Sequence, residues 1–103
     1  IGLNIDVNVS PVESQFLAIY PNPIYFGDAP ILQVDISATV IPQIIIYNLL
    51  GTEVVNATIP SLDQGRHDIS LTPILSPQMA SGVYVMDVIL DNKIFTRKFT
   101  LIK

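Results

Sequence analysis

The stretch that decides the fold is the C-terminal run Ala80–Lys103, which reads A-S-G-V-Y-V-M-D-V-I-L-D-N-K-I-F-T-R-K-F-T-L-I-K. Both halves of this run are rich in β-branched and aromatic residues, which suit a pleated, half-buried strand. Between the halves lie Asp91 and Asn92, residue types that tight turns prefer. The run therefore predicts a β-hairpin of two strands joined by a short turn.

The predicted hairpin is also locally basic. Four of the five basic residues of the chain fall within residues 93–103, a segment without Asp or Glu; they are Lys93, Arg97, Lys98 and Lys103. Because alternate residues of a strand point to opposite faces, one member of the pair Arg97 and Lys98 should lean towards the core or a sheet edge. The hairpin could simply complete a sheet, or it could also serve as an address that a partner reads.

The chain upstream of the hairpin shows further short strand patterns. Leu32, Val34 and Ile36 alternate with polar residues, which is typical of a strand with one buried face. Residues 43–50 are apolar at nearly every position, as expected for a central strand, and Gly51 can supply the positive φ of a hairpin corner. Strands are expected at 3–9, 16–20, 31–39, 43–50, 54–59 and 66–71, with a stiff bend at Tyr20–Pro23 for which Tyr20 is the expected packing anchor.

The spacing of these segments predicts the fold class. Seven to eight short strands, with turn signals between them and no convincing helix, favour an all-β, immunoglobulin-like antiparallel β-sandwich. A small barrel is the alternative architecture. The chain has no Cys, so the resemblance to antibody domains is architectural only.

Composition limits the function classes. The 103 residues are enough for one domain, and half of them are hydrophobic, with a mean hydropathy of +0.51. No apolar run approaches the roughly 18 residues that a membrane-spanning helix requires. Because the composition is unusually apolar for a domain of this size, exposed apolar surface is expected, and such surface usually marks a contact site. A net charge of −4 argues against nucleic-acid binding, which needs a basic face.

Groups that could perform catalysis are scarce. The one histidine, His67, precedes Asp68 in a predicted strand, and adjacent strand residues point to opposite faces. No phosphate-binding loop, Ser-elbow motif or EF-hand loop occurs, so no enzyme activity, cofactor or metal site is expected. A calcium ion held by loop carbonyls with Asp28 or Asp63 is left open, although solvated turn aspartates are the simpler interpretation.

The aromatic residues suggest one alternative function. Eight tyrosines and phenylalanines could include a platform on which sugars stack, although aromatic residues on strands more often belong to the core. They are Phe16, Tyr20, Tyr25, Phe26, Tyr47, Tyr84, Phe95 and Phe99. This pattern keeps a carbohydrate-binding or adhesion module of a secreted protein as the alternative hypothesis.

Four short motifs carry a family resemblance. In order they are Tyr20-Pro21-Asn22-Pro23, the segment Ile46–Val54 with Tyr47 and Gly51, Ala80-Ser81-Gly82-Val83-Tyr84, and the closing Thr96–Lys103. Together they closely resemble the type A C-terminal sorting domain of the type IX secretion system of Bacteroidetes. The resemblance covers about residues 17–103. The connection at 72–79 looks longer than is usual in the family, and Asp87 stands where the family often has a basic or neutral residue.

The resemblance implies a sorting function. Such a domain follows an N-terminal cargo, passes from the periplasm across the outer membrane, and is read by the translocon and a shuttle protein. A sortase-like peptidase then usually removes it, and the cargo is attached to the cell surface or released. On this basis residues 1–15 are a linker or N-terminal strand with the processing region, and residues 16–103 are the sorting domain.

The resemblance also implies which residues matter. Tyr20, Pro21, Asn22, Pro23, Tyr47 and Gly51 are expected to shape the fold. Gly82, Val83, Tyr84, Arg97, Lys98, Phe99 and Lys103 are expected to serve partner recognition. The basic last strand is expected at or near a sheet edge, where a partner could add a strand. Self-association through an open edge is left open.

Overall fold

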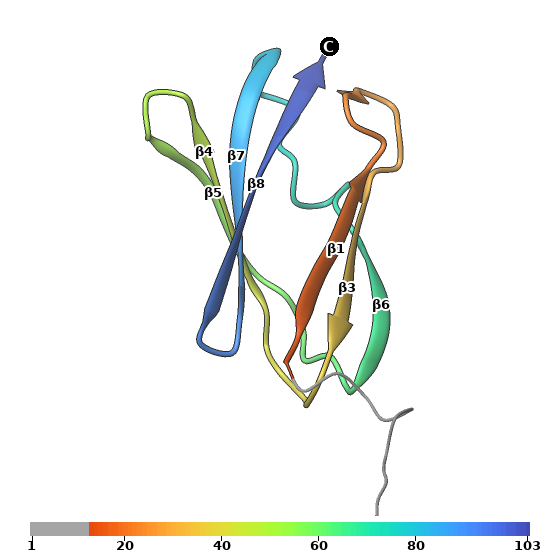
Figure 1. The fold of residues 1–103 in the computed structure, drawn as a ribbon. Coiled ribbons are helices and arrows are strands. Elements are labelled where there is room, and N and C mark those ends of the chain that lie inside the picture. Colours follow the sequence, from red (N-terminus) through yellow and green to blue (C-terminus); the bar gives the residue numbers. More distant parts are fainter. Residues whose placement is uncertain (1–12) are drawn as a thin grey trace, which may run out of the picture.

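A computed structural model describes residues 13–103, which form eight β-strands joined by turns and loops (Figure 1). The strands are β1 (Gln15–Tyr20), β2 (Ile24–Tyr25), β3 (Ile31–Ile36), β4 (Gln43–Asn48), β5 (Glu53–Thr58), β6 (Gly65–Ser70), β7 (Gly82–Leu90) and β8 (Lys93–Ile102). Within these residues no helix has the length and apolar character needed to cross a membrane. The strand expected at 3–9 lies outside the described residues.

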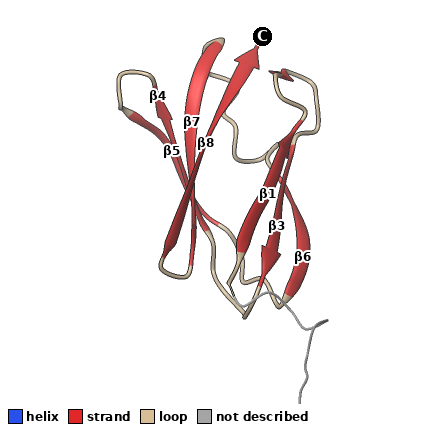
Figure 2. Ribbon diagram, in the orientation of Figure 1, coloured by secondary structure: helices blue, strands red, loops and turns tan. Residues whose placement is uncertain are grey.

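The strands form two separate sheets that face each other (Figure 2). One sheet has the order β1-β3-β6 and the other the order β2-β8-β7-β4-β5. All paired strands are antiparallel except β2 and β8, which run parallel over two residues. Two stacked sheets make the molecule a β-sandwich rather than a barrel, and the prediction of an all-β, immunoglobulin-like sandwich is confirmed.

Alternation along the strands builds the core between the sheets. In β3, the side chains of Leu32, Val34 and Ile36 are fully buried, while those between them are partly exposed. Burying one such aliphatic side chain stabilises the fold by about 1.5–3 kcal/mol. The buried residues come from both sheets and the connections: Phe16, Ile24, Leu32, Val34, Ile36, Ile44, Ile46, Ile69, Leu71, Met79, Tyr84, Met86, Val88, Leu90, Phe99 and Leu101.

The central strand and the terminal hairpin are confirmed. The strand β4 lies between β7 and β5, as the apolar run at 43–50 predicted, but it ends at Asn48 because Leu49, Leu50 and Gly51 form the turn. The hairpin pairs β7 with β8 from Leu90 to Gly82, and its turn holds Asp91 at a φ of 56°.

The expected role of Tyr20 as a packing anchor is wrong, since its side chain is 44% exposed. The ladder between β1 and β3 is irregular between Phe16 and Ala18, and this shift reverses the alternation along β1. Phe16 and Ile19 therefore pack on the core side, and Tyr20 points away from it.

The first described residue and the last residue lie at different ends of the sandwich. The side chain of Glu13, just before β1, forms an ion pair with Lys93 at the start of β8. Lys103 follows the other end of β8, a strand of ten residues that spans about 33 Å. Residue 13 and the C-terminal residue therefore lie at opposite ends of the sandwich (Figure 1).

Candidate functional site

Four motifs that lie far apart in the sequence meet at one end of the sandwich. Asn48 is paired with Tyr84, and Leu101 is paired with Gly82 on one side and with Ile24 on the other. The β4–β5 turn, the start of β7 and the end of β8 are accordingly at the same end of the molecule (Figure 1). We call this region the motif end; it comprises residues 20–28, 48–53, 72–84 and 99–103.

The bend Tyr20–Pro23 fastens the last strand. Both of its X-Pro peptide bonds are cis. The Asn22 carboxamide lies against β8, where its Oδ1 accepts the Thr100 N–H at 3.1 Å and its Nδ2 donates to the Lys98 carbonyl at 3.5 Å. The side chain thus takes the place of a neighbouring strand, and β2 continues this pairing along the end of β8.

The second motif closes the β4–β5 corner. The Asn48 side-chain oxygen accepts the N–H groups of Leu50 at 2.9 Å and Thr52 at 3.0 Å, and the Gly51 N–H donates to the Asn48 carbonyl at 3.0 Å. Gly51 has a φ of 84°, which side chains with a Cβ rarely adopt, so a glycine is suited to this position. The corner exposes Leu49 and Leu50, of which Leu50 is 91% exposed.

The third motif is tied to the fourth by a buried tyrosine. The Tyr84 hydroxyl donates to the Ala80 carbonyl at 2.6 Å, and its ring stacks on Phe99 at a centroid distance of 5.7 Å. The Lys103 N–H donates to the Ser81 hydroxyl at 2.8 Å. These contacts hold the start of β7 and the end of β8 in one arrangement.

The basic residues of the hairpin do not form one patch. Lys93 lies at the end opposite to Lys103, and its ion pair with Glu13 shows that the bases are separated from acids in the sequence but not in the fold. Arg97 points inward from β8, with its guanidinium carbon 4.5 Å from the centre of the Phe16 ring in the other sheet. Both Arg97 and Lys98 are exposed, but the contact with Phe16 makes Arg97 the member of the pair that leans towards the other sheet.

The last strand is only partly open along its edge. Thr100 and Ile102 direct backbone groups away from β7, towards Asn22 and Phe26 respectively. The Arg97 side chain donates to the Thr96 carbonyl at 2.9 Å, which covers another outward group. Strand addition to β8 is therefore restricted to the part near Ile94 unless β2 and Asn22 move away.

The residues predicted for recognition divide into two groups. Gly82, Val83, Tyr84 and Phe99 come together at the motif end with Lys103, whereas Arg97 and Lys98 lie further down β8. Tyr84 and Phe99 are buried, so their side chains support this end from within. Val83 and Lys103 are exposed there.

The structure adds contacts that the sequence did not reveal. The short strand β2 and the connection at 72–79 form part of the motif end, although β2 has only two residues and no alternation to signal it.

The exposed apolar surface expected from the hydropathy is present, with Ile41, Leu49, Leu50 and Ile94 each more than 60% exposed.

The titratable side chains that were considered for catalysis or calcium binding do not come together in one site. His67 Nε2 lies 2.7 Å from the Asp63 carbonyl, while the Asp68 carboxylate accepts from Gln33 at 3.0 Å. The carboxylates of the two loop aspartates considered for calcium also have partners: Asp28 accepts the Tyr25 N–H, and Asp63 accepts the Thr39 hydroxyl. Across residues 13–103, no group of three or more His, Cys, Asp or Glu side chains could hold a metal ion.

The aromatic residues are mostly in or near the core. Three of the eight are well exposed, namely Tyr20, Tyr25 and Phe26, and the other five are buried or half-buried. This division fits the interpretation that most of them serve packing.

Comparisons with known proteins give the family and support the fold. A family model described as the secretion system C-terminal sorting domain matches residues 18–103. No curated protein matches the chain. Among solved structures, the chain is similar to the Pseudomonas fluorescens alkylpurine DNA glycosylase AlkC bound to DNA containing an abasic site analog, with a TM-score of 0.51 and 15% identity.

That structural likeness concerns the fold alone. The match covers 88% of this chain and 31% of the glycosylase chain, so this chain spans less than a third of that protein. The family match, in contrast, extends over most of the described residues and includes the four motifs that meet at the motif end. The chain therefore belongs to the family of C-terminal sorting domains of the type IX secretion system.

Proposed function

We propose that the motif end is the surface that the type IX translocon and its shuttle protein read. The family is one of sorting signals rather than of enzymes, and it implies a cargo that is exported across the outer membrane to the cell surface or beyond. The observation that carries the proposal is the convergence of four motifs, the first and last of which lie more than 70 residues apart in the sequence, at one end of the sandwich.

The position of the motif end suits this role. Because residue 13 lies at the opposite end of the sandwich, a cargo joined through the N-terminal segment leaves the motif end accessible. Lys103 and Val83 offer a charge and an apolar group there, while Lys98 extends the surface along β8. Arg97 supports the surface by its contact with Phe16.

The processing step is proposed to fall before β1. The Ser14 hydroxyl accepts the Ser37 N–H at 3.0 Å, and its side chain is buried against β3. Cleavage within β1 would divide a strand that is paired with β3, so we place sortase-like cleavage N-terminal to Ser14, where it leaves every described strand intact. The cleaved cargo would then be attached to the cell surface or released.

Association between two copies is a separate proposal. Among the strands that the structure describes, β5 has a neighbour on one side only, and its sequence E-V-V-N-A-T carries a single charge. Edge strands with few charges and several β-branched residues pair readily with other strands, so we expect any self-association to use β5 rather than β8.

The test is export of a reporter joined to the N-terminus of residues 1–103 in a bacterium that has a type IX system. We expect the reporter at the cell surface or in the medium, with a domain-free reporter kept in the periplasm as control. Deletion of residues 99–103 is a poor variant, because it removes the core side chains of Phe99 and Leu101. The paired charge reversal Lys98→Glu with Lys103→Glu keeps the core and should reduce export.

The outcomes separate the two hypotheses. Periplasmic retention of the wild-type fusion would count against a sorting signal. If instead the domain stays on the mature extracellular protein and binds glycans in a pull-down, the carbohydrate-binding alternative would be favoured. Mass spectrometry of the exported cargo gives its C-terminal residue and thus the cleavage position.

A further inference from the structure

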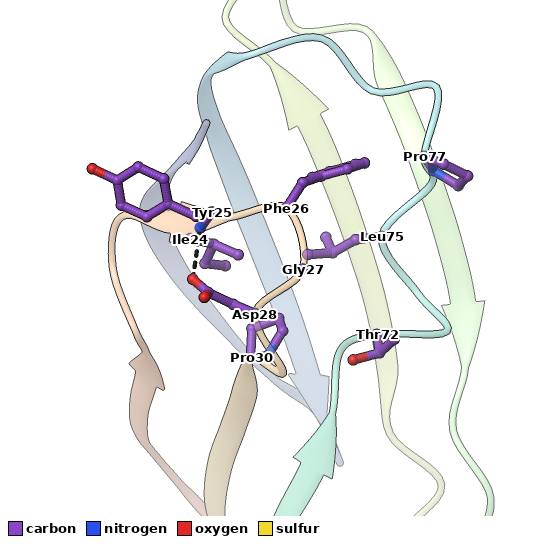
Figure 3. A pocket seen from close by; sticks show the side chains of 9 residues that line it. All are labelled: Ile24, Tyr25, Phe26, Gly27, Asp28, Pro30, Thr72, Leu75 and Pro77. Atoms are coloured by element: carbon purple, nitrogen blue, oxygen red, sulfur yellow. Dashed lines mark hydrogen bonds between the residues drawn. The ribbon is translucent and has the colours of Figure 1, made fainter. Parts of the chain in front are cut away.

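A cavity of about 260 Å³ opens at the motif end, between the β2–β3 corner and the connection from β6 to β7 (Figure 3). Ile24, Phe26 and Pro30 line one side of it, and Thr72, Leu75 and Pro77 line the other. The cavity thus joins the segment that follows the Tyr20–Pro23 bend to the segment that precedes the Ala80–Tyr84 motif.

The cavity is apolar and its β2–β3 wall is held in place. Ile24 and Pro30 are buried in the wall, and Leu75 is half-buried. The charged residue of the wall, Asp28, accepts the Tyr25 N–H through its carboxylate at 2.7 Å, and its own N–H donates to the Tyr25 carbonyl at 2.9 Å. The carboxylate lies on the side of the corner away from Leu75 (Figure 3), so it points away from the apolar part of the lining.

A positively charged side chain lies near the cavity. The Lys103 ammonium lies 5.4 Å from the centre of the Phe26 ring, one of the lining side chains. The Lys103 backbone is held by the Ser81 hydroxyl, so the side chain starts from a fixed position. Within residues 13–103, Lys103 takes part in no ion pair, and its charge is available to a partner.

We propose that this cavity receives one aromatic side chain from an acidic segment of a type IX partner protein. This inference rests on the proposed function, because it assigns the partner from the position of the cavity at the motif end. An apolar cavity of about 150 Å³ is sufficient to bind benzene, whereas pockets for whole drug-sized ligands start at about 300 Å³. The volume therefore suits a single ring.

The surroundings of the cavity determine the chemistry of the partner segment. Phe26 is 38% exposed and would be covered by the inserted ring, which removes apolar surface from water. An acidic residue next to that ring would pair with the Lys103 ammonium, whereas a basic residue in the same place would be repelled.

The binding test uses the full chain of residues 1–103 and three short peptides. The probe is acetyl-Glu-Trp-Glu-amide, and its controls are acetyl-Glu-Ala-Glu-amide and acetyl-Lys-Trp-Lys-amide. We expect the probe to shift the NMR signals of the Leu75 methyl groups and the Thr72 amide. Its dissociation constant should be at least about fivefold lower than that of either control peptide. In the variant Lys103→Gln, the preference for the acidic Trp peptide over the basic one should fall towards equality.

This experiment does not depend on secretion. Equal binding of all three peptides, or shifts that lie away from the cavity, would overturn the assignment of an acidic aromatic segment.

The export test fills the cavity. Thr72 is an exposed residue of the wall, and Thr72→Trp should place an indole in the cavity, whereas Thr39→Trp puts the same group in the connection between β3 and β4, at the other end of the sandwich. We expect export of the reporter to fall about tenfold for Thr72→Trp and to stay close to wild type for Thr39→Trp. Urea unfolding of both purified variants should match wild type.

The outcomes distinguish the two proposals. If the wild-type fusion is exported and Thr72→Trp is exported equally well, the cavity has no role and the sorting function stands. If the wild-type fusion is not exported, the sorting function itself fails. Should Thr72→Trp lose its fold, Lys103→Glu replaces it, because this exposed residue contributes no core packing; undiminished export of Lys103→Glu then contradicts the proposal.

Discussion

At the scale of single residues, Tyr84 gives the sharpest stability prediction. Tyr84→Phe keeps the ring against Phe99 but removes the hydrogen bond from the hydroxyl to the Ala80 carbonyl. We expect the free energy of unfolding to fall by about 1 kcal/mol, measured as a lower urea midpoint. Tyr84→Ala also loses the ring and should cost about 3–5 kcal/mol.

The matched control is Tyr25→Phe, because Tyr25 is 54% exposed. Its free energy of unfolding should stay within about 0.5 kcal/mol of wild type, as is usual for surface substitutions. Equal effects of the two tyrosine-to-phenylalanine changes would contradict a structural role for the Tyr84 hydroxyl.

Gly51 gives a second prediction at this scale. Its φ of 84° lies in the left-handed region, where a Cβ costs roughly 1–2 kcal/mol. No heavy atom lies within 4 Å of a Cβ built at Gly51, so backbone strain is the expected cause of any loss. Gly51→Ala should therefore lower the urea midpoint, and Gly51→Asn should lower it less, because Asn tolerates this conformation. Unchanged stability in Gly51→Ala would show that the corner adapts.

The face on which an individual side chain lies could not always be predicted from the sequence. Alternation along β8 predicted that either Arg97 or Lys98 would lean inward, but the choice of Arg97 depends on the Phe16 ring of the other sheet. Tyr20 was placed wrongly for a similar reason, because a ladder irregularity changes the face on which it lies. Pairing between distant segments decides such details, and a local pattern does not contain it.

At the scale of elements, β2 with Asn22 forms a latch on the end of β8. Asn22→Ala removes the acceptor of the Thr100 N–H, which leaves this amide to water. We expect native-state hydrogen exchange at Thr100 to accelerate roughly two- to tenfold, in line with the loss of one hydrogen bond. The measurement is amide exchange followed by NMR.

Asn22→Asp is the matched control because it keeps an acceptor oxygen at the same place. The Thr100 amide should stay protected in this variant, and the Leu90–Lys93 end of the hairpin should be unaffected in both. Equal exchange at Thr100 in wild type and Asn22→Ala would contradict the latch.

The elements also differ in how well they could be predicted. The strands β3, β4, β7 and β8 have clear alternation or continuous apolar runs, and all four were predicted within a few residues. The strand β2 was missed because a two-residue strand between proline bends has no period to read. Residues 24 and 25 form a strand only because they pair in parallel with Leu101 and Ile102, which lie more than 70 positions later in the sequence.

At the scale of the whole molecule, the order of the motifs indicated the family, while the fold explains why the motifs occur together. Asn48 pairs with Tyr84, and Leu101 of β8 pairs with both Gly82 and Ile24. A substitution that shifts the backbone of one motif therefore also shifts the motifs paired with it. The sequence could predict each motif but not the common end at which they lie. The cavity beside them was also beyond reach, because it forms between two loops.

The separation of the two ends leads to the last prediction. A small folded domain joined directly after Lys103 would lie against the motif end and block it, so export should be lost. The same domain inserted between Asp91 and Asn92 lies at the turn of the hairpin, a strand length away, and should leave most of the export intact. Surface fractionation of the reporter measures both. Because both fusions carry the same added mass, equal export would mean that recognition does not take place at the motif end.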